Sequence, residues 1–207
     1  MEEEYNVQIP LIGEFNVYNV LAAIAAAHAK GIALEQIIPI LKNIQPVAGR
    51  LEIVTSPRED DISVIVDFAH TPDSLEKSLQ IFQDIEHEEI ISVFGCGGDR
   101  DASKRPIMAQ IGVDHSDLAI FTADNPRTEN QEDIFADMEV GLEGDNYIKI
   151  GDRGEAIAYA IKNANKGDVI LIAGKGHEDY QIVGTEKTHF DDREEARKAL
   201  SKRRKKV

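Results

Sequence analysis

The sequence has a single cysteine and a shortage of basic residues. Cys96 alone excludes an internal disulfide framework and fits a reducing cytoplasm. The chain has 23 lysine and arginine residues against 38 aspartate and glutamate residues. Its formal net charge of -15 argues against nucleic-acid binding, because neutralising phosphates requires a basic face. The basic tail, residues 201–207, is an exception that we predict to be a frayed, solvated terminus.

Long apolar runs are also lacking. The most apolar stretch, residues 20–32, contains His28 and Lys30 and is too short to span a membrane. The first residues, "MEEEYNVQ", are acidic where a secretory signal is basic and then apolar, so they indicate no export. A lone cysteine cannot build a structural zinc site, and we expect none. These absences predict a cytoplasmic protein with no membrane and no nucleic-acid partner.

Two helices are predicted near the N-terminus. The first is Ala-rich, with Asn16 as its N-cap and Gly31 as its stop signal. The second, shorter helix is predicted over residues 34–44. "PVAGR" then has the proline and glycine of a connector, and the pattern changes after it. We therefore divide the chain into residues 1–47 and residues 48–207.

Beyond this boundary, apolar β-type runs alternate with amphipathic helical segments. Near-continuous runs of valine, isoleucine and leucine separated by helices are typical of a parallel sheet covered on both faces. The predicted fold class is α/β, with a Rossmann-like, doubly wound, mostly parallel sheet preceded by a short, mainly helical segment. The predicted strands cover residues 62–68, 90–95, 117–122 and 168–174, with a weaker one at 146–150.

A polar or glycine-rich cluster follows each of the four stronger strands. In chain order these clusters are "DFAHTPD", "GCGGDRD", "ADNPRTE" and "GKGHED". The carboxyl ends of parallel strands open onto the same edge of a sheet, and ligands bind there. The sequence therefore predicts that the four clusters form one site.

The turn "DNPR" presents an arginine at a strand end. Pro126 stiffens the turn, and a positioned Arg127 guanidinium suits bidentate contact with a carboxylate. An ion pair with Glu129 or Asp124 is an alternative of about equal weight.

The glycines of "GCGGDRD" would let the backbone approach a ligand closely, and Arg100 follows them. A tight strand-to-helix turn would explain Gly95, Gly97 and Gly98 equally well. Arg105, near the start of the next helix, is predicted to be a solvated surface residue.

In "GKGHED", Glu178 beside two arginines would recognise a ligand with both charges, such as an amino acid. Alternatively, His177 with its neighbouring acid could form a general acid–base pair, and Lys175 could meet a phosphate or water.

"DFAHTPD" contains the start of a helix, with Thr71 as N-cap and Pro72 at the first helical position. Asp67 and His70 are not needed for that start. An aspartate at this edge of a sheet often meets a ribose hydroxyl in nucleotide sites.

These clusters, in this order, resemble the Mur ligase family of peptidoglycan synthesis, and within it the branch that adds the third residue of the stem peptide. Six ordered motifs extend from Gly13 to about Leu200 and cover nearly the whole chain. The matching text is "GEFNVYNVLAAIAAA", "PVAGRLE", "VDFAHTPDSLE", "FGCGGDRD" with "KRPIM", "TADNPRTE" and "AGKGHEDYQ".

The resemblance implies an ATP- and Mg²⁺-dependent ligase that forms an amide bond through an acyl phosphate. It implies meso-diaminopimelate, ATP and UDP-MurNAc-dipeptide as small-molecule substrates, and it assigns no catalytic residue to this chain. The residues implied for meso-diaminopimelate are Arg100, Asn125, Arg127, Gly174 and Glu178, and those for the nucleotide are Asn19, Arg50, Asp67 and His70. Arg127 would bind the carboxylate that diaminopimelate has and lysine lacks.

The departures from the family's pattern concern its other domains. The UDP-sugar domain, the phosphate loop and the magnesium ligands have no counterpart here, and residues 1–47 resemble only the tail of the central ATP-binding domain. We therefore expect a C-terminal portion of a ligase, residues 48–207 being its amino-acid-binding domain, without turnover by this chain alone. Alternatives are a lysine-adding or polyglutamate-type ligase, which "DNPR" disfavours, and a non-catalytic amino-acid-binding module.

Overall fold

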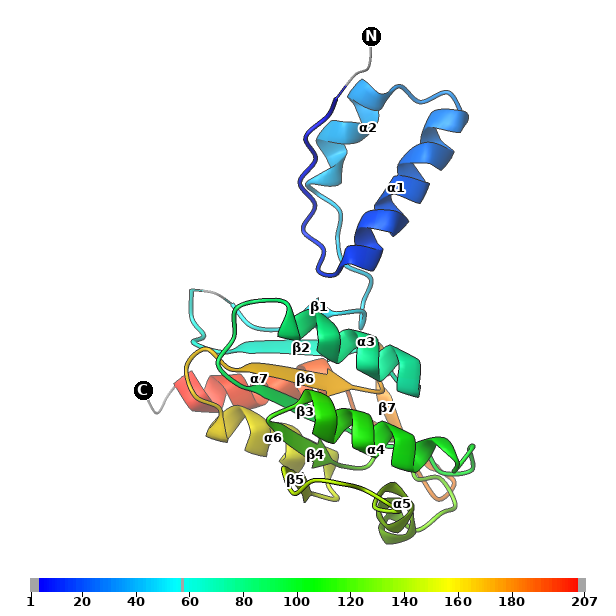
Figure 1. The fold of residues 1–207 in the computed structure, drawn as a ribbon, viewed down its shortest axis with the longest axis vertical. Helices are drawn as coiled ribbons and strands as arrows, with labels where there is room; N and C mark the ends of the chain where they lie inside the picture. The colour runs from blue at the N-terminus through cyan, green and yellow to red at the C-terminus, as the bar shows by residue number, and fades with distance from the viewer. Residues whose placement is uncertain (1–3, 57, 205–207) are drawn as a thin grey trace. The chain divides into compact units, whose positions relative to one another are not determined.

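The computed structural model describes residues 4–56 and 58–204, and the chain divides into two compact units, Met1–Val47 and Ala48–Val207. The first unit contains an extended segment and two helices, α1 (Glu14–Ala29) and α2 (Leu34–Leu41) (Figure 1). Val20 of α1 is buried against Ile37 and Leu41 of α2, which gives this unit a small core of its own.

The predicted N-cap of the first helix is wrong. Helix α1 begins at Glu14, after Gly13, whose φ of 92° suits a glycine. Asn16 lies inside the first turn, where its Nδ2 donates to the backbone oxygen of Ile12 over 2.7 Å. The predicted stop is confirmed, since Gly31 follows the helix with a φ of 88°.

The second unit has the α/β fold class that the sequence predicts. Its described residues contain a six-stranded sheet. The strand order is β1-β2-β6-β3-β4-β5, and every neighbouring pair except β1 with β2 is parallel. The predicted strands are confirmed, while the two-residue β1 is too short to leave a sequence pattern. The bounds are β1 (Glu52–Ile53), β2 (Ser63–Asp67), β3 (Ile90–Phe94), β4 (Leu118–Phe121), β5 (Tyr147–Lys149) and β6 (Val169–Ala173).

Helices cover both faces of this sheet (Figure 1). Helices α6 and α7 share a buried core with alternate strand residues such as Val64, Val93 and Ile172. The opposite face meets α3 and α4, where Phe94 of β3 packs against Gly112 so closely that a Cβ there would lie 2.4 Å from the ring. The bounds are α3 (Pro72–Gln83), α4 (Lys104–His115), α5 (Gln131–Met138), α6 (Arg153–Asn163) and α7 (Asp192–Arg204).

The start of α3 is confirmed in detail. The Thr71 side chain accepts a hydrogen bond from the Ser74 backbone N–H, the Ser74 side chain accepts from the Thr71 N–H, and Pro72 occupies the first turn. This reciprocal capping box satisfies two backbone donors that the helix cannot pair itself.

A hairpin follows β6 that the sequence analysis missed. It consists of β7 (Tyr180–Val183) and β8 (Glu186–His189), and its strands are antiparallel. Its first strand lies against the turn after β4, since Arg127 and Val183 form a bridge. Each strand has only four residues and β8 is entirely polar, which explains why no long apolar run marked the hairpin.

The prediction of a frayed basic tail is wrong for residues 201–204, which belong to α7. Arg203 Nη2 lies 3.2 Å from an Asp61 carboxylate oxygen, and Arg204 Nη2 lies 2.6 Å from Asp60 Oδ2. Residues 205–207 lie outside the described part of the chain. Of the helices in residues 4–56 and 58–204, none has the length and apolar character that crossing a membrane requires.

A buried ion pair joins the two helices behind the sheet. The side chains of Arg153, which opens α6, and Asp192, which opens α7, are fully buried and meet at 2.7 Å. Arg153 also donates from Nη2 to the backbone oxygen of Ala173, over 2.9 Å, at the end of β6. The pair therefore anchors both helix starts beside the carboxyl end of the central strand.

We expect Asp192→Asn to lower the free energy of unfolding by about 3 kcal/mol or more, because it leaves the Arg153 charge buried without its partner. Urea denaturation at neutral pH measures this loss. The control is Glu195→Gln on the same helix, whose partner Lys198 has a 60% exposed side chain and whose loss should cost less than about 1 kcal/mol. Equal losses in the two variants would contradict the role given to the buried pair.

Candidate binding site

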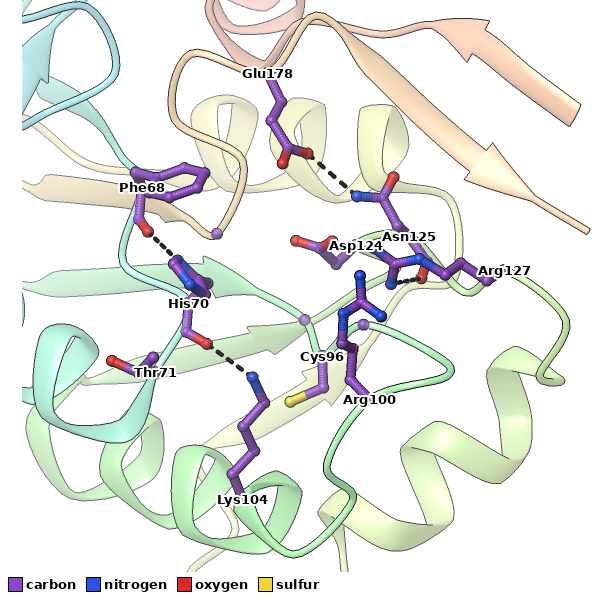
Figure 2. A pocket seen from close by; sticks show the side chains of 13 residues that line it. Phe68, His70, Thr71, Cys96, Arg100, Lys104, Asp124, Asn125, Arg127 and Glu178 are labelled. Atoms are coloured by element: carbon purple, nitrogen blue, oxygen red, sulfur yellow. Dashed lines mark hydrogen bonds between the residues drawn. The ribbon is translucent and has the colours of Figure 1, made fainter. Parts of the chain in front are cut away.

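A cavity of about 350 Å³ lies at the carboxyl ends of β2, β3, β4 and β6 (Figure 2). Each of the four predicted polar clusters contributes to its wall, which confirms that they meet at one edge of the sheet. The lining residues are Phe68, His70, Thr71, Gly95, Cys96, Gly97, Arg100, Lys104, Asp124, Asn125, Arg127, Gly174 and Glu178.

The five residues that the resemblance implies for an amino acid all line this cavity, and His70 lines it as well. The other residues implied for a nucleotide do not belong to its wall. Arg50 lies nearby, with its guanidinium 4.7 Å from the centre of the Phe68 ring. Asn19 belongs to the first unit, where its exposed Nδ2 donates to Asn16 Oδ1 over 3.3 Å.

The backbone holds Arg127 in an unusual conformation. Its φ is 50°, its N–H donates to the Ile182 oxygen of the hairpin, and its own oxygen accepts from the Gly184 N–H. The Nη1 group donates to the Gly98 oxygen over 2.8 Å and to the Asn125 oxygen over 3.3 Å. These contacts aim the side chain into the cavity.

The structure does not contain the ion pair that was the alternative interpretation of Arg127. Among the ion pairs of residues 4–56 and 58–204, none joins Arg127 to Asp124 or to Glu129. Glu129 is instead the partner of Arg105. The hydrogen bonds of the Arg127 guanidinium in the described residues go from Nη1 to the Gly98 and Asn125 oxygens.

Arg105 is not the solvated residue that the sequence analysis predicts. It is 2% exposed, and its Nη1 lies 2.8 Å from Glu129 and 2.7 Å from Asp137. Its Nη2 donates to the Gly97 oxygen over 3.2 Å. Glu129 in turn accepts a hydrogen bond from the Asp99 N–H. Arg105 thus ties the loop after β3 to the turn after β4.

The glycines between β3 and α4 allow this loop to pack closely against the turn after β4. A Cβ at Gly95 would lie 1.9 Å from the Thr122 oxygen, and one at Gly98 would lie 1.8 Å from the Pro126 oxygen. A Cβ at Gly97 would lie 3.0 Å from Nη1 of Arg127. Without side chains here, the two loops can approach closely and leave room for the Arg127 guanidinium.

Asn125 is the most enclosed polar side chain of the cavity wall, with 2% of its surface exposed. Its Nδ2 donates to Glu178 Oε2 over 3.2 Å. Its Oδ1 accepts from the Lys175 ammonium over 3.0 Å and from the Ile182 N–H over 2.9 Å. Lys175 is fully buried, so the prediction that it meets a phosphate or water is wrong.

His177 and Glu178 do not form the acid–base pair considered from the sequence. The exposed His177 ring packs on Phe68, with 5.2 Å between the ring centres. Glu178 contacts Asn125, and its charge raises the pKa of Tyr180. Within the described residues, no hydrogen bond joins the His177 ring to the Glu178 carboxylate.

Asp67 and His70 have structural partners at the end of β2. Asp67 is 6% exposed, and its carboxylate accepts from the Ser78 hydroxyl over 2.6 Å and from the Phe68 N–H over 2.7 Å. His70 donates from Nδ1 to the Phe68 oxygen over 2.8 Å. Lys104 donates to the His70 oxygen over 3.2 Å.

Cys96 lines the cavity but is 2% exposed, and burial raises the pKa of its thiol to about 12. A thiol with that pKa is protonated at neutral pH and is a poor nucleophile. Within the described ranges, no group of three or more His, Cys, Asp or Glu side chains is arranged to hold a metal ion.

The charges of the cavity have both signs (Figure 2). Arg100, Arg127 and Lys104 contribute cations, and Asp124 and Glu178 contribute carboxylates. Such a wall suits a small ligand that carries ammonium and carboxylate groups. Five lining residues, namely Phe68, Thr71, Cys96, Lys104 and Asp124, were not assigned to the site from the sequence, although they lie within or just after the predicted clusters.

Comparison with known proteins identifies the family. The model of the Mur ligase, glutamate ligase domain matches residues 49–176, so the chain belongs to the Mur ligase family. The region that matches includes β2 to β6 and every residue of the cavity wall except Glu178.

Two similar curated relatives are ligases of diaminopimelate. The UDP-N-acetylmuramoyl-L-alanyl-D-glutamate--2,6-diaminopimelate ligase of Geobacillus kaustophilus (strain HTA426) is 51% identical over 199 residues, which are 95% of this chain and 40% of that protein. The enzyme of the same name from Lactiplantibacillus plantarum is 54% identical over 196 residues, 95% of this chain and 39% of that protein. The chain thus spans about 40% of the length of these relatives.

Solved structures agree with this assignment. A UDP-N-acetylmuramoyl-L-alanyl-D-glutamate--2,6-diaminopimelate ligase superposes with a TM-score of 0.75 at 40% identity, over 96% of this chain and 40% of that one. A folylpolyglutamate synthase from Thermotoga maritima superposes with a TM-score of 0.61 at 20% identity, over 82% of this chain and 38% of that one. The second likeness concerns the fold alone.

The Arg105–Glu129 contact predicts an acid-dependent stability. The hydrogen bond from Arg105 holds the pKa of Glu129 below its ordinary value of 4.5. A depressed carboxyl pKa stabilises the fold above the unfolded pKa, and this contribution is lost as the pH falls through the folded pKa. We therefore expect Glu129→Gln to destabilise the chain at neutral pH, with the difference from wild type narrowing below about pH 4.5.

Urea denaturation of both proteins across this pH range measures the difference in unfolding free energy. Glu186→Gln, at an exposed position on β8, is the control and should change little at any pH. A deficit of Glu129→Gln that stays constant down to the acid limit would show that the Glu129 charge does not stabilise the loops.

Proposed function

We propose that this chain is the amino-acid-binding part of a UDP-N-acetylmuramoyl-L-alanyl-D-glutamate--2,6-diaminopimelate ligase and that its cavity holds meso-diaminopimelate. The observation that carries the proposal is the meeting of Arg100, Asn125, Arg127 and Glu178, from three separate loops, on one small cavity. Relatives that are 51% and 54% identical and carry this name support it.

The proposed ligand matches the charges of the wall. Diaminopimelate is a symmetric chain with an ammonium and a carboxylate at each end. We place the carboxylate of the far end against Arg127 and the Nδ2 group of Asn125, both of which donate hydrogen bonds. Glu178 and Asp124 then face its ammonium, while Arg100 and the backbone at Gly174 complete the wall.

Selection against lysine follows from the same contacts. Lysine lacks the far carboxylate, so its binding would leave the N–H groups of Arg127 and Asn125 that do not already bond to Glu178 or to loop oxygens without an acceptor in a partly buried site. Unpaired polar groups disfavour the wrong substrate more strongly than one missing contact does. This argument favours diaminopimelate over the lysine-adding alternative.

The whole protein's reaction is part of the proposal, because the chain spans about 40% of its relatives' length. We propose ATP-dependent, cytoplasmic amide-bond formation between UDP-MurNAc-dipeptide and diaminopimelate, with Mg²⁺ and the ATP phosphates bound outside residues 48–207. Met1–Val47 would belong to the tail of the ATP-binding domain. Arg50 and His70 are the residues whose exposed side chains best suit a nucleotide contact, and Asn19 is a third candidate. The Asp67 carboxylate already has two donors, which weakens its case.

Arg127→Ala tests the proposal. We expect the unmodified chain to bind meso-diaminopimelate more tightly than L-lysine, as measured by NMR titration or calorimetry. The substitution should weaken diaminopimelate binding roughly 10- to 100-fold, because it removes a charge-assisted contact, and should leave lysine binding nearly unchanged.

Arg197→Ala is the matched control, since that arginine lies on α7 with a 57% exposed side chain and does not line the cavity. It should bind both amino acids as the unmodified chain does. If the unmodified chain has no preference for diaminopimelate over lysine, the proposed function is wrong.

A further inference from the structure

We propose that Lys175 is a positioning residue that, together with the β7–β8 hairpin, orients the Asn125 amide so that its Nδ2 group faces the cavity as a hydrogen-bond donor. This inference rests on the proposed function and extends it. It assigns a role to a buried residue outside the cavity lining, one that does not touch the ligand but determines which ligand group can hydrogen-bond to Asn125.

The orientation of the Asn125 amide depends on its hydrogen-bond partners. The two ends of an asparagine amide are nearly equal in shape, but one is a donor and the other an acceptor. The Lys175 ammonium and the Ile182 N–H can only donate, and both lie against the same atom, Asn125 Oδ1, at 3.0 Å and 2.9 Å. Turning the amide over would set its NH₂ group against two donors and break both hydrogen bonds.

Burial makes the loss of either hydrogen bond to Asn125 Oδ1 costly. Asn125 is 2% exposed and Lys175 is fully buried, so water cannot replace a lost partner at Oδ1. Lys175 is itself held in place, because its Nζ also donates to the Tyr180 oxygen over 2.8 Å. Burial lowers the pKa of Lys175, but a neutral amine would still have two N–H groups for these two acceptors. In either charge state of Lys175, the Ile182 N–H can only donate, and it requires Oδ1 on its side.

The hairpin supplies the second donor and holds the rest of the turn. Besides the Ile182 N–H, it provides the Ile182 oxygen that accepts from the Arg127 N–H over 3.1 Å. Gln181 Nε2 donates to the Asp124 oxygen over 2.9 Å. Asp124, Asn125 and Arg127 are thus all positioned from the segment that follows Lys175.

As a consequence, the cavity wall has hydrogen-bond donors at the place where the far carboxylate of diaminopimelate would lie. Nδ2 of Asn125 points toward the cavity beside Glu178, and the Arg127 guanidinium lies next to it (Figure 2). A ligand carboxylate can accept from both groups. Without Lys175 the amide could turn over and present Oδ1, which would repel a carboxylate.

Lys175→Met tests the inference, because methionine fills a similar volume without a donor. We expect it to weaken binding of meso-diaminopimelate about 10-fold while binding of L-lysine changes less than about two-fold, as measured by NMR titration or calorimetry of the chain. Lys187→Met is the matched control, since Lys187 lies on the same hairpin with an exposed side chain over the Tyr180 ring. It should bind both amino acids as the unmodified chain does.

A double-mutant cycle separates positioning from a general loss of positive charge. If Lys175 acts through Asn125, adding Lys175→Met to Asn125→Ala should weaken diaminopimelate binding no further. An equal loss in both backgrounds would mean that Lys175 acts by its charge alone, and the inference would be wrong.

Asn125→Asp tests the orientation without removing the lysine, in case Lys175→Met does not fold. The aspartate keeps the acceptor toward Lys175 and Ile182 but replaces the cavity-facing NH₂ by an oxygen. We expect diaminopimelate binding to fall at least 10-fold and the fold to be retained. Unchanged binding in this variant would overturn the orientation, while a lack of diaminopimelate binding by the unmodified chain would instead overturn the proposed function.

Discussion

The site depends on one constraint: two positive charges, those of Arg100 and Arg127, must be held in one cavity. Arg100 and Arg127 flank Gly97, since a Cβ there would lie 3.0 Å from Arg127 Nη1 and 3.6 Å from Arg100 Cγ. Like charges repel, so this arrangement needs acceptors around it. Backbone oxygens of Asp99 and Gly98 supply them, at 3.1 Å and 2.8 Å. The carboxylates that complete the wall leave a cavity suited to a ligand of mixed charge.

The close fit of two loops keeps these charges in place. The loop after β3 and the turn after β4 approach so closely that Gly95 and Gly98 leave no space for a Cβ. The buried Arg105 bridges the same two segments through Gly97 and Glu129. These contacts hold the two segments against each other, and loops held in this way reduce the cost of ordering a site on binding.

The sequence predicted the strands and the place of the polar clusters better than the partners of individual side chains. Apolar runs identified the strands, because a strand buried on both faces must be apolar throughout. Parallel pairing then placed the four clusters at one edge. The hairpin β7–β8 left no such run, and the burial of Arg105 and Lys175 could not be predicted, since charged residues are usually exposed. Asn16 resembled a helix cap, but the helix begins two residues earlier.

The sequence by itself determined the fold class, the family resemblance and the set of loops that build the cavity, because these follow from local pattern and strand order. Only the tertiary structure decided that Glu129 pairs with Arg105 and not with Arg127, and that Asn125 presents its NH₂ group to the cavity. These outcomes depend on partners such as Lys175, which lies 50 residues from Asn125 along the chain. A contact of that kind leaves no mark on local pattern, since it exists only once the sheet brings distant loops together.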